Sequence, residues 1–117
     1  YEYLNVIAAN DPIPFYNLGL LYGYYLKEPA KAQPKYERAL AIAPDEPSFY
    51  IGFANFHREV RDDFTSAESL LLKGLSILPQ SVSIEIALAS LYEDIGNKTK
   101  AISFYQAALL HPELKGD

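Results

Sequence analysis

The residues of this chain best suited to acid–base chemistry or metal binding are its two histidines, His57 and His111. No nucleophile–base motif, phosphate-binding loop or metal-ligand spacing includes either of them. His57 occupies a position that tyrosine fills in two related segments described below, so a packing or surface role is expected. His111 precedes Pro112 and is expected near a helix C-terminus, where a cation interacts favourably with the helix dipole.

Two pairs of adjacent carboxylates are the next candidates: Asp62 with Asp63, and Glu93 with Asp94. Neighbouring side chains of a helix project about 100° apart, so Glu93 and Asp94 are poorly placed to bind one metal ion together. We expect these carboxylates to form a solvated helix face or a helix cap. The sequence therefore predicts no enzyme activity, no metal site and no cofactor in this chain.

The charge of the chain narrows the class of partner. Its 117 residues include 10 Lys and Arg against 15 Asp and Glu, a net charge of −5 with a pI near 4.9. Nucleic acids and anionic membranes select basic surfaces, so neither is expected as a partner. No apolar run approaches the roughly 18 residues of a membrane-spanning helix. Because the sequence begins with Tyr1 rather than Met, we expect it to be a segment of a longer protein, and its compartment stays open.

An internal repeat organises the sequence. The same classes of residue recur after 35 residues and then after 33 to 35 more. The recurring sets are Leu18, Phe53 and Leu88; Gly19, Ala54 and Ala89; Tyr22, His57 and Tyr92; Ala32, Ala67 and Ala101; Tyr36, Leu71 and Tyr105; Ala39, Gly74 and Ala108; and Pro44, Pro79 and Pro112. The chain is therefore expected to contain three copies of one structural unit.

Each unit has the pattern of two amphipathic helices. Phe15, Leu18, Gly19 and Tyr22 lie at i, i+3, i+4 and i+7, which is one face of a helix. The second half of the unit shows a similar periodicity from Ala32 onward. The small residues would let two helix backbones approach closely. One such pair cannot bury its apolar face alone, so stacking of neighbouring pairs is expected to complete the core.

This pattern resembles the tetratricopeptide repeat family, whose signature is an aromatic, Leu-Gly and Tyr in the first helix and Ala, an aromatic, Ala and Pro in the second. The match is closest at residues 15–22 (FYNLGLLY) and 101–109 (AISFYQAAL). The resemblance implies an all-α fold, an α-solenoid of three tandem helix–turn–helix repeats in a right-handed superhelix. It implies a single domain over residues 1–117, with repeats at about 12–46, 47–81 and 82–113 and an N-terminal helical remnant at 1–11.

We expect six main helices and no sheet, near residues 13–26, 33–43, 47–60, 64–77, 82–95 and 98–110, preceded by an additional N-terminal helical stretch. Pro14 and Pro47 stand where a first-turn proline is tolerated. A proline inside a helix removes a hydrogen bond and clashes with the preceding turn. The second helix of the first repeat is therefore expected to begin near Gln33 or Pro34.

The turns within the repeats also follow from local signals. Asp63 or Thr65 is expected to cap one helix, and Asn97 or Thr99 another. Gly96 is expected to end a helix in a left-handed conformation. The first two units each carry one extra residue at the turn between their two helices, which explains a period of 35 rather than 34 residues.

The resemblance also implies a binding face. Tyr16, Leu20 and Tyr24 lie on one helical stripe (i, i+4, i+8) that resembles the concave groove of the family. The equivalent residues of the next two repeats are Ile51, Asn55 and Glu59, then Ile86, Ser90 and Asp94. The predicted groove residues are Tyr16, Leu20, Tyr24, Ile51, Asn55, Ile86 and Ser90. The alternative is that this stripe only covers neighbouring helices.

The groove interpretation predicts a protein-interaction scaffold that holds a peptide or helix of a partner protein. The stripe is apolar at one end, whereas Glu59, Glu93 and Asp94 make the other end negative, so an apolar segment with a flanking Lys or Arg is favoured. Asn55 and Ser90 would hydrogen-bond the partner's backbone. A secretion or assembly chaperone and a regulatory module of a larger enzyme are the alternatives.

The last helix offers a competing surface. Ile102, Tyr105 and Leu109 are expected to form an apolar strip with no further helix over it. Exposed strips of this kind drive association. We therefore also expect self-association through the C-terminal helix.

Overall fold

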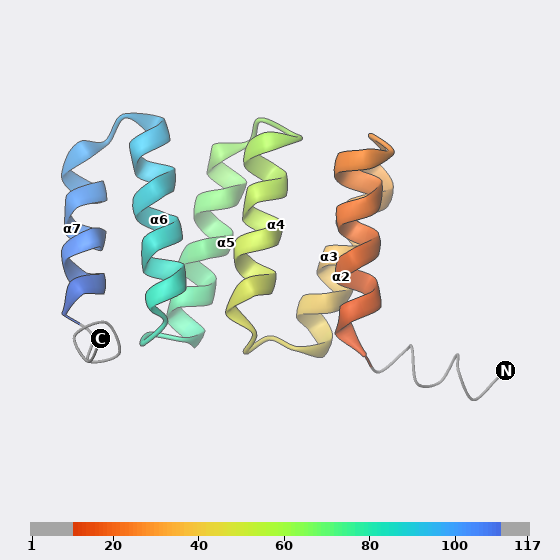
Figure 1. Cartoon of the computed structure of the whole chain (residues 1–117), viewed down its shortest axis with the longest axis horizontal. Helices are drawn as coiled ribbons and strands as arrows, with labels where there is room; N and C mark the ends of the chain where they lie inside the picture. The colour runs from red at the N-terminus through yellow and green to blue at the C-terminus, as the bar shows by residue number, and fades with distance from the viewer. Residues whose placement is uncertain (1–10, 111–117) are drawn as a thin grey trace, which may run out of the picture.

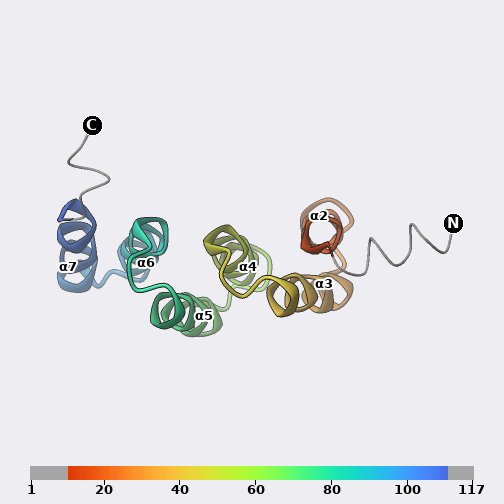
Figure 2. The ribbon, with the colours of Figure 1, turned by 90° about the horizontal axis from the view of Figure 1, so that it is seen from below.

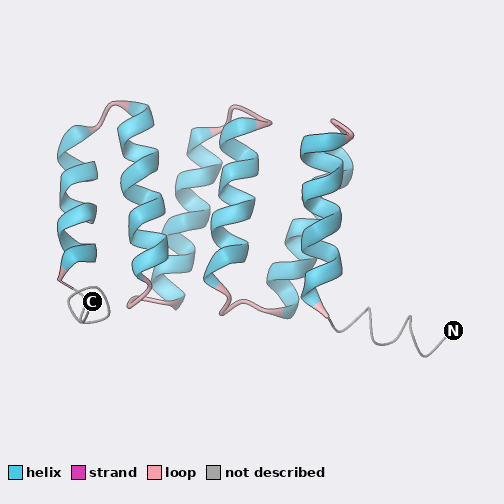
Figure 3. Cartoon of the chain, viewed as in Figure 1, coloured by secondary structure: helices cyan, strands magenta, loops and turns pink. Residues whose placement is uncertain are grey.

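The computed structural model describes residues 11–110, and these form helices joined by short turns, with no strand among them (Figures 1 and 3). The elements are α2 (Pro12–Leu20), η1 (Leu21–Tyr25), α3 (Pro29–Ile42), α4 (Pro47–Glu59), α5 (Phe64–Ile77), α6 (Val82–Ile95) and α7 (Lys98–Leu109). The predicted all-α repeat fold is confirmed. The predicted N-terminal helical stretch lies almost entirely outside the described residues, and His111 lies outside them too.

The helices are arranged as three consecutive pairs: α2 and η1 with α3, α4 with α5, and α6 with α7. Seen from below, α2, α4 and α6 lie in one layer and α3 and α5 lie in the opposite layer (Figure 2). We call α2 with η1, α4 and α6 the first-helix layer. Each pair packs mainly against its neighbours in the chain, as is typical of repeat proteins.

The turn inside each repeat is built the same way three times. One residue adopts a left-handed backbone conformation: Lys27 (φ 57°), Asp62 (φ 55°) and Gly96 (φ 95°). The backbone N–H of the following residue then donates to an equivalent carbonyl of the first helix: Glu28 to Tyr22 at 2.7 Å, Asp63 to His57 at 2.8 Å and Asn97 to Tyr92 at 2.8 Å. The donor follows the acceptor by six, six and five residues, which confirms the extra turn residue predicted for the first two repeats.

Of the two candidates predicted for each helix cap, the structure has Asp63 in the second repeat and Asn97 in the third. The Asp63 carboxylate accepts a hydrogen bond from the backbone N–H of Ser66 at 3.0 Å, and the Asn97 side chain accepts one from Lys100 at 3.2 Å. Each bond satisfies a backbone donor that the first helical turn leaves free. Gly96 ends α6 in the left-handed conformation expected for it.

The second helix of the first repeat begins earlier than predicted. α3 starts at Pro29, four residues before the predicted start at residue 33, and Pro34 lies inside it. An interior proline costs roughly 3 kcal/mol, but the helical turn before it places Ala32 in the core, where its exposure is 0%. Tyr36, one turn further on, is 1% exposed. The prediction was wrong because burial of this face outweighs the hydrogen bond lost at Pro34.

The first helix also differs from the single helix predicted over residues 13–26. It is α-helical only to Leu20 and continues as the π-helix η1, in which the backbone N–H of Leu26 donates to the carbonyl of Leu21 at 2.9 Å. A π-helical turn accommodates one more residue than an α-helical turn. No sequence signal distinguished the two conformations.

The two junctions between repeats are packed by different classes of side chain. Five rings contact one another at the first junction, with Tyr36 stacked on Phe53 at a centroid distance of 5.0 Å. The five are Tyr16, Tyr36, Phe49, Phe53 and Phe56. Their equivalents 35 residues later are Ile51, Leu71, Ile84, Leu88 and Leu91. The α2 and α4 backbones approach each other less closely than those of α4 and α6, as expected if rings need more room than aliphatic side chains.

Two buried tyrosines provide a matched test of this core. The Tyr36 hydroxyl is buried without a hydrogen-bond partner, whereas Tyr50 donates to the Pro44 carbonyl at 2.7 Å, and both residues are 1% exposed. An unpaired buried polar group is costly and a made hydrogen bond contributes about 1 kcal/mol. We expect Tyr36→Phe to leave the free energy of unfolding unchanged or raise it, and Tyr50→Phe to lower it by about 1 kcal/mol. Urea unfolding followed by circular dichroism measures both, and equal losses would contradict this assignment.

Candidate partner-binding face

The predicted groove residues all lie on the first-helix layer and none of them is fully buried. Ile86 is 41% exposed, and the others are half-buried. The half-buried residues are Tyr16, Leu20, Tyr24, Ile51, Asn55 and Ser90. They come from α2, η1, α4 and α6, which the fold sets side by side (Figure 2). We call these seven residues the first-helix stripe.

Tyr16 packs between the first two repeats. Its ring lies 4.9 Å from that of Phe49 and 5.7 Å from that of Tyr36, measured between centroids. A Cβ atom at Gly52 would overlap the Tyr16 hydroxyl, so the absence of a side chain on α4 makes room for this ring. Burial raises the pKa of the Tyr16 hydroxyl. Tyr16 thus holds α2 against α4 and leaves only part of its ring to a ligand.

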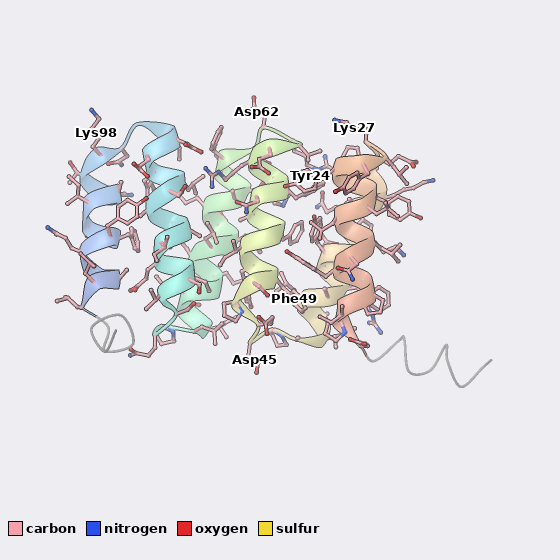
Figure 4. All side chains as sticks on the ribbon, in the orientation of Figure 1. Tyr24, Lys27, Asp45, Phe49, Asp62 and Lys98 are labelled. Carbon is pink, nitrogen blue, oxygen red and sulfur yellow. The ribbon has the colours of Figure 1, made fainter. Side chains whose placement is uncertain are left out.

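Two polar contacts join consecutive repeats at the acidic end of the stripe. The Tyr24 hydroxyl donates to Glu59 Oε1 at 2.7 Å, and Figure 4 shows Tyr24 reaching from the first repeat toward α4. Burial, and then the bond to Glu59, raise the pKa of Tyr24. Arg58 pairs with Asp94 of α6, and its guanidinium also approaches Asn55 Oδ1 at 3.5 Å. The 35-residue spacing of Tyr24, Glu59 and Asp94 places them in one row, but it did not predict these pairings.

The acidic end carries less free charge than the sequence suggests. Glu59 and Asp94 have the partners just described, and Glu93 Oε1 accepts a hydrogen bond from the Tyr105 hydroxyl at 2.6 Å. Three carboxylates and the Arg58 guanidinium leave a net charge of −2 in this region. The electrostatic potential at this end of the stripe is therefore negative, as predicted, but the ion pair between Arg58 and Asp94 lowers its magnitude.

His57 packs inside the repeat stack. It is 7% exposed, stacks on Phe53 at a centroid distance of 4.7 Å, and has no hydrogen-bond partner at Nδ1. Burial lowers the pKa of its imidazole, although the nearby Asp63 carboxylate acts in the opposite direction. Within residues 11–110, no three His, Cys, Asp or Glu side chains form a group that could hold a metal ion.

Comparison with protein families gives two matches. Tetratricopeptide repeat models match residues 14–46 and 86–117, and these segments cover the first and third repeats. Such repeats generally mediate protein–protein interactions. A comparison with curated proteins finds no match to the chain. Among the helices of the described segment, none has the length and apolar character needed to cross a membrane.

The buried imidazole of His57 makes stability depend on pH. The folded state lowers its pKa below the ordinary value of 6.5, so the unfolded chain binds a proton more readily between the two pKa values. The stabilisation is therefore complete above about pH 6.5 and is lost as the pH falls through the folded pKa. We expect the free energy of unfolding to fall between pH 7.5 and pH 5, and to fall less in His57→Phe. Urea unfolding across this range measures the effect, and an equal fall in both proteins would show that His57 is not its source.

Proposed function

We propose, from the premise that the chain belongs to the tetratricopeptide repeat family, that its first-helix layer holds a short segment of a partner protein. The supporting observation is the partial exposure of apolar and aromatic stripe residues on three neighbouring first helices. The role is one of binding rather than catalysis. The occupant is a peptide or helix with apolar side chains and a flanking Lys or Arg.

The apolar part of the occupant would contact Leu20, Ile51 and Ile86. Leu20 and Ile51 are half-buried against the core, so their position is held by packing, whereas Ile86 offers the largest exposed surface of the three. Burial of apolar surface contributes about 25 cal/mol per Å². A few such anchors can supply most of the binding free energy of a peptide.

The polar part of the occupant would lie toward the other end of the stripe. The net negative charge around Glu59 and Glu93 favours a Lys or Arg there. Asn55 uses its carbonyl oxygen toward Arg58, which leaves its amide nitrogen to donate to a partner's backbone carbonyl. Ser90 is half-buried one turn from Ile86 and offers a hydroxyl to the same backbone.

The outer face of α7 is a second candidate surface, and its occupant would be another copy of this chain. Ile102 is 56% exposed and Leu109 is 63% exposed. Tyr105 is half-buried and already bonded to Glu93, so the strip is more aliphatic than the sequence suggests. An exposed apolar strip of this kind favours association with a second copy.

Ile86→Ser tests the stripe without disturbing the core, whereas Tyr16→Ala would remove a ring from the repeat junction. Partner proteins captured by the wild-type chain are identified, and their affinity for each variant is then measured. Truncating a good anchor costs roughly 2 kcal/mol, so we expect Ile86→Ser to weaken binding about thirtyfold. Ile95→Ser is the matched control, since Ile95 lies on the same helix and is 48% exposed. Circular dichroism checks that both variants stay folded.

Two outcomes of this experiment would contradict the proposal. The first is an equal loss of partner affinity in Ile86→Ser and Ile95→Ser, which would show that the first-helix stripe does not bind the partner. The second is binding that survives Ile86→Ser but is abolished by Ile102→Ser with Leu109→Ser, which would move the partner site to α7.

Self-association has its own test. Sedimentation velocity over a wide concentration range is expected to show dimers or larger species of the wild-type chain. Ile102→Ser with Leu109→Ser should remove them, because these changes replace the two most exposed apolar side chains of the strip formed by Ile102, Tyr105 and Leu109. A wild-type chain that stays monomeric at the highest concentration would contradict the role given to α7.

A further inference from the structure

A groove runs along the opposite side of the molecule, between α3 and α5. It consists of two adjoining hollows of about 480 Å³ and 350 Å³. Both are lined by Glu37, Phe53, Leu70 and Lys73, so they form one continuous depression. α3 and α5 lie in the layer opposite the first helices (Figure 2), which separates this groove from the first-helix stripe.

The floor of the groove is a single stripe of α4. Tyr50, Phe53 and His57 lie at i, i+3 and i+7 and are 1%, 5% and 7% exposed. The half near Tyr50 is apolar, with Leu40 and Ile77 on its walls. The half near His57 is polar and is lined by Gln33, Thr65, Ser66 and Ser69. The groove therefore offers an apolar trough that ends at a buried imidazole.

His57 itself opens the polar half. In the third repeat, the residue equivalent to His57 is Tyr92, whose hydroxyl donates a hydrogen bond to Glu68 of α5 at 2.6 Å. This bond crosses the position that corresponds to the polar half of the groove. The residue equivalent to Glu68 in the first repeat is Gln33, which bonds Glu37 at 3.2 Å instead. The shorter imidazole does not reach across, and its Nδ1 is left without a hydrogen-bond partner. The His57 ring stacks on Phe53, but this departure from the repeat pattern leaves space in the groove and a buried nitrogen without a partner.

The two walls carry opposite charges. Glu37 on α3 and Lys73 on α5 are both exposed, and neither belongs to the ion pairs formed within residues 11–110. An occupant that lies between them meets an acidic wall on one flank and a basic wall on the other. Charge complementarity then selects Lys or Arg on the first flank and Asp or Glu on the second.

The length and chemistry of the groove favour a helix over an extended strand. On α5 the lining residues run from Thr65 to Ile77, which spans about 18 Å at 1.5 Å per residue. This is the length of about three helical turns. Most of the side chains that line the apolar half are apolar, and the Tyr50 hydroxyl is already bonded to Pro44, so Glu37 and Lys73 are its polar groups with no backbone partner of their own. An extended backbone would leave most of its polar groups unsatisfied there, whereas a helix satisfies its own.

We propose that the groove between α3 and α5 is a docking site for an amphipathic helix of a partner protein, about three turns long. Its apolar side chains enter between Leu40, Phe53 and Leu70. Its basic flank lies along Glu37 and its acidic flank along Lys73. This site is independent of the first-helix stripe, so either site can fail its test without the other.

Three stapled helical peptides of about twelve residues serve as probes. They share one leucine face and differ only in their flanks: Lys on one flank and Glu on the other, Lys on both, or Glu on both. Fluorescence anisotropy of the labelled peptides gives their affinities for the full chain. We expect the mixed peptide to bind most tightly to the wild type, although the chain's net charge of −5 favours the all-Lys peptide on its own.

Four variants locate the binding. Ser69 is exposed on the groove wall, so Ser69→Trp should obstruct the groove and weaken the mixed peptide at least tenfold, while Ser103→Trp on the exposed surface of α7 should not. Glu37→Lys should shift the preference to the all-Glu peptide, and Lys73→Glu should shift it to the all-Lys peptide. Circular dichroism checks that each variant stays folded. The wild-type chain contains no Trp, so each Trp variant carries a single indole.

Unchanged binding in Ser69→Trp, or a flank preference that does not follow the wall charges, would overturn the proposal. Binding that is weakened by Ile86→Ser but not by Ser69→Trp would place the peptide on the first-helix stripe and would also overturn the proposal. A dimer of the chain that dissociates in Ser69→Trp would assign the groove to a second copy and would likewise overturn it.

Discussion

Rings that lie directly against residues with little or no side chain set the distances in this fold. A Cβ atom at Gly19 would lie 3.0 Å from the Tyr36 ring, and one at Gly74 would lie 2.8 Å from the Tyr50 ring. Alanines on four successive helices are also 0% exposed: Ala32, Ala54, Ala67 and Ala89. Each ring fills the space that the small residue leaves, and the helices approach only as far as this packing allows. A substitution at either partner is therefore expected to change the distance between the two helices that it joins.

The choice of ring or aliphatic chain at these positions differs between the two junctions. Tyr36, Phe53 and Phe56 fill the first, whereas leucines occupy the equivalent positions of the second. The bulkier filling holds α2 away from α4, and Tyr16 and Tyr24 reach across that space to Gly52 and Glu59. The contacts of Tyr16 and Tyr24 across the first junction thus depend on the packing of its core.

Much of this architecture follows from the 35-residue period, and the rest depends on contacts that a period does not specify. Periodicity predicted the helix pairs and the longer turns of the first two repeats, and local capping signals narrowed each cap to two candidates, because all of these depend on residues close in sequence. The start of α3 at Pro29 was missed because burial of Ala32 overrides the local rule for Pro34. Tyr16 was predicted to line the groove, and its ring packs largely into the junction between the first two repeats. Helical periodicity places a long side chain on one face of a helix but does not specify which neighbouring residue it contacts. The partner of Arg58 and the stacking of His57 on Phe53 were missed for the same reason.

Amide chemical-shift mapping can establish whether the first-helix layer holds a segment of a partner protein. The labelled chain is titrated with a peptide from a captured partner, and the perturbed residues are placed on the fold. We expect the perturbations to cluster around Leu20, Ile51 and Ile86, on three different helices. Perturbations confined to α7, or to the groove between α3 and α5, would contradict it.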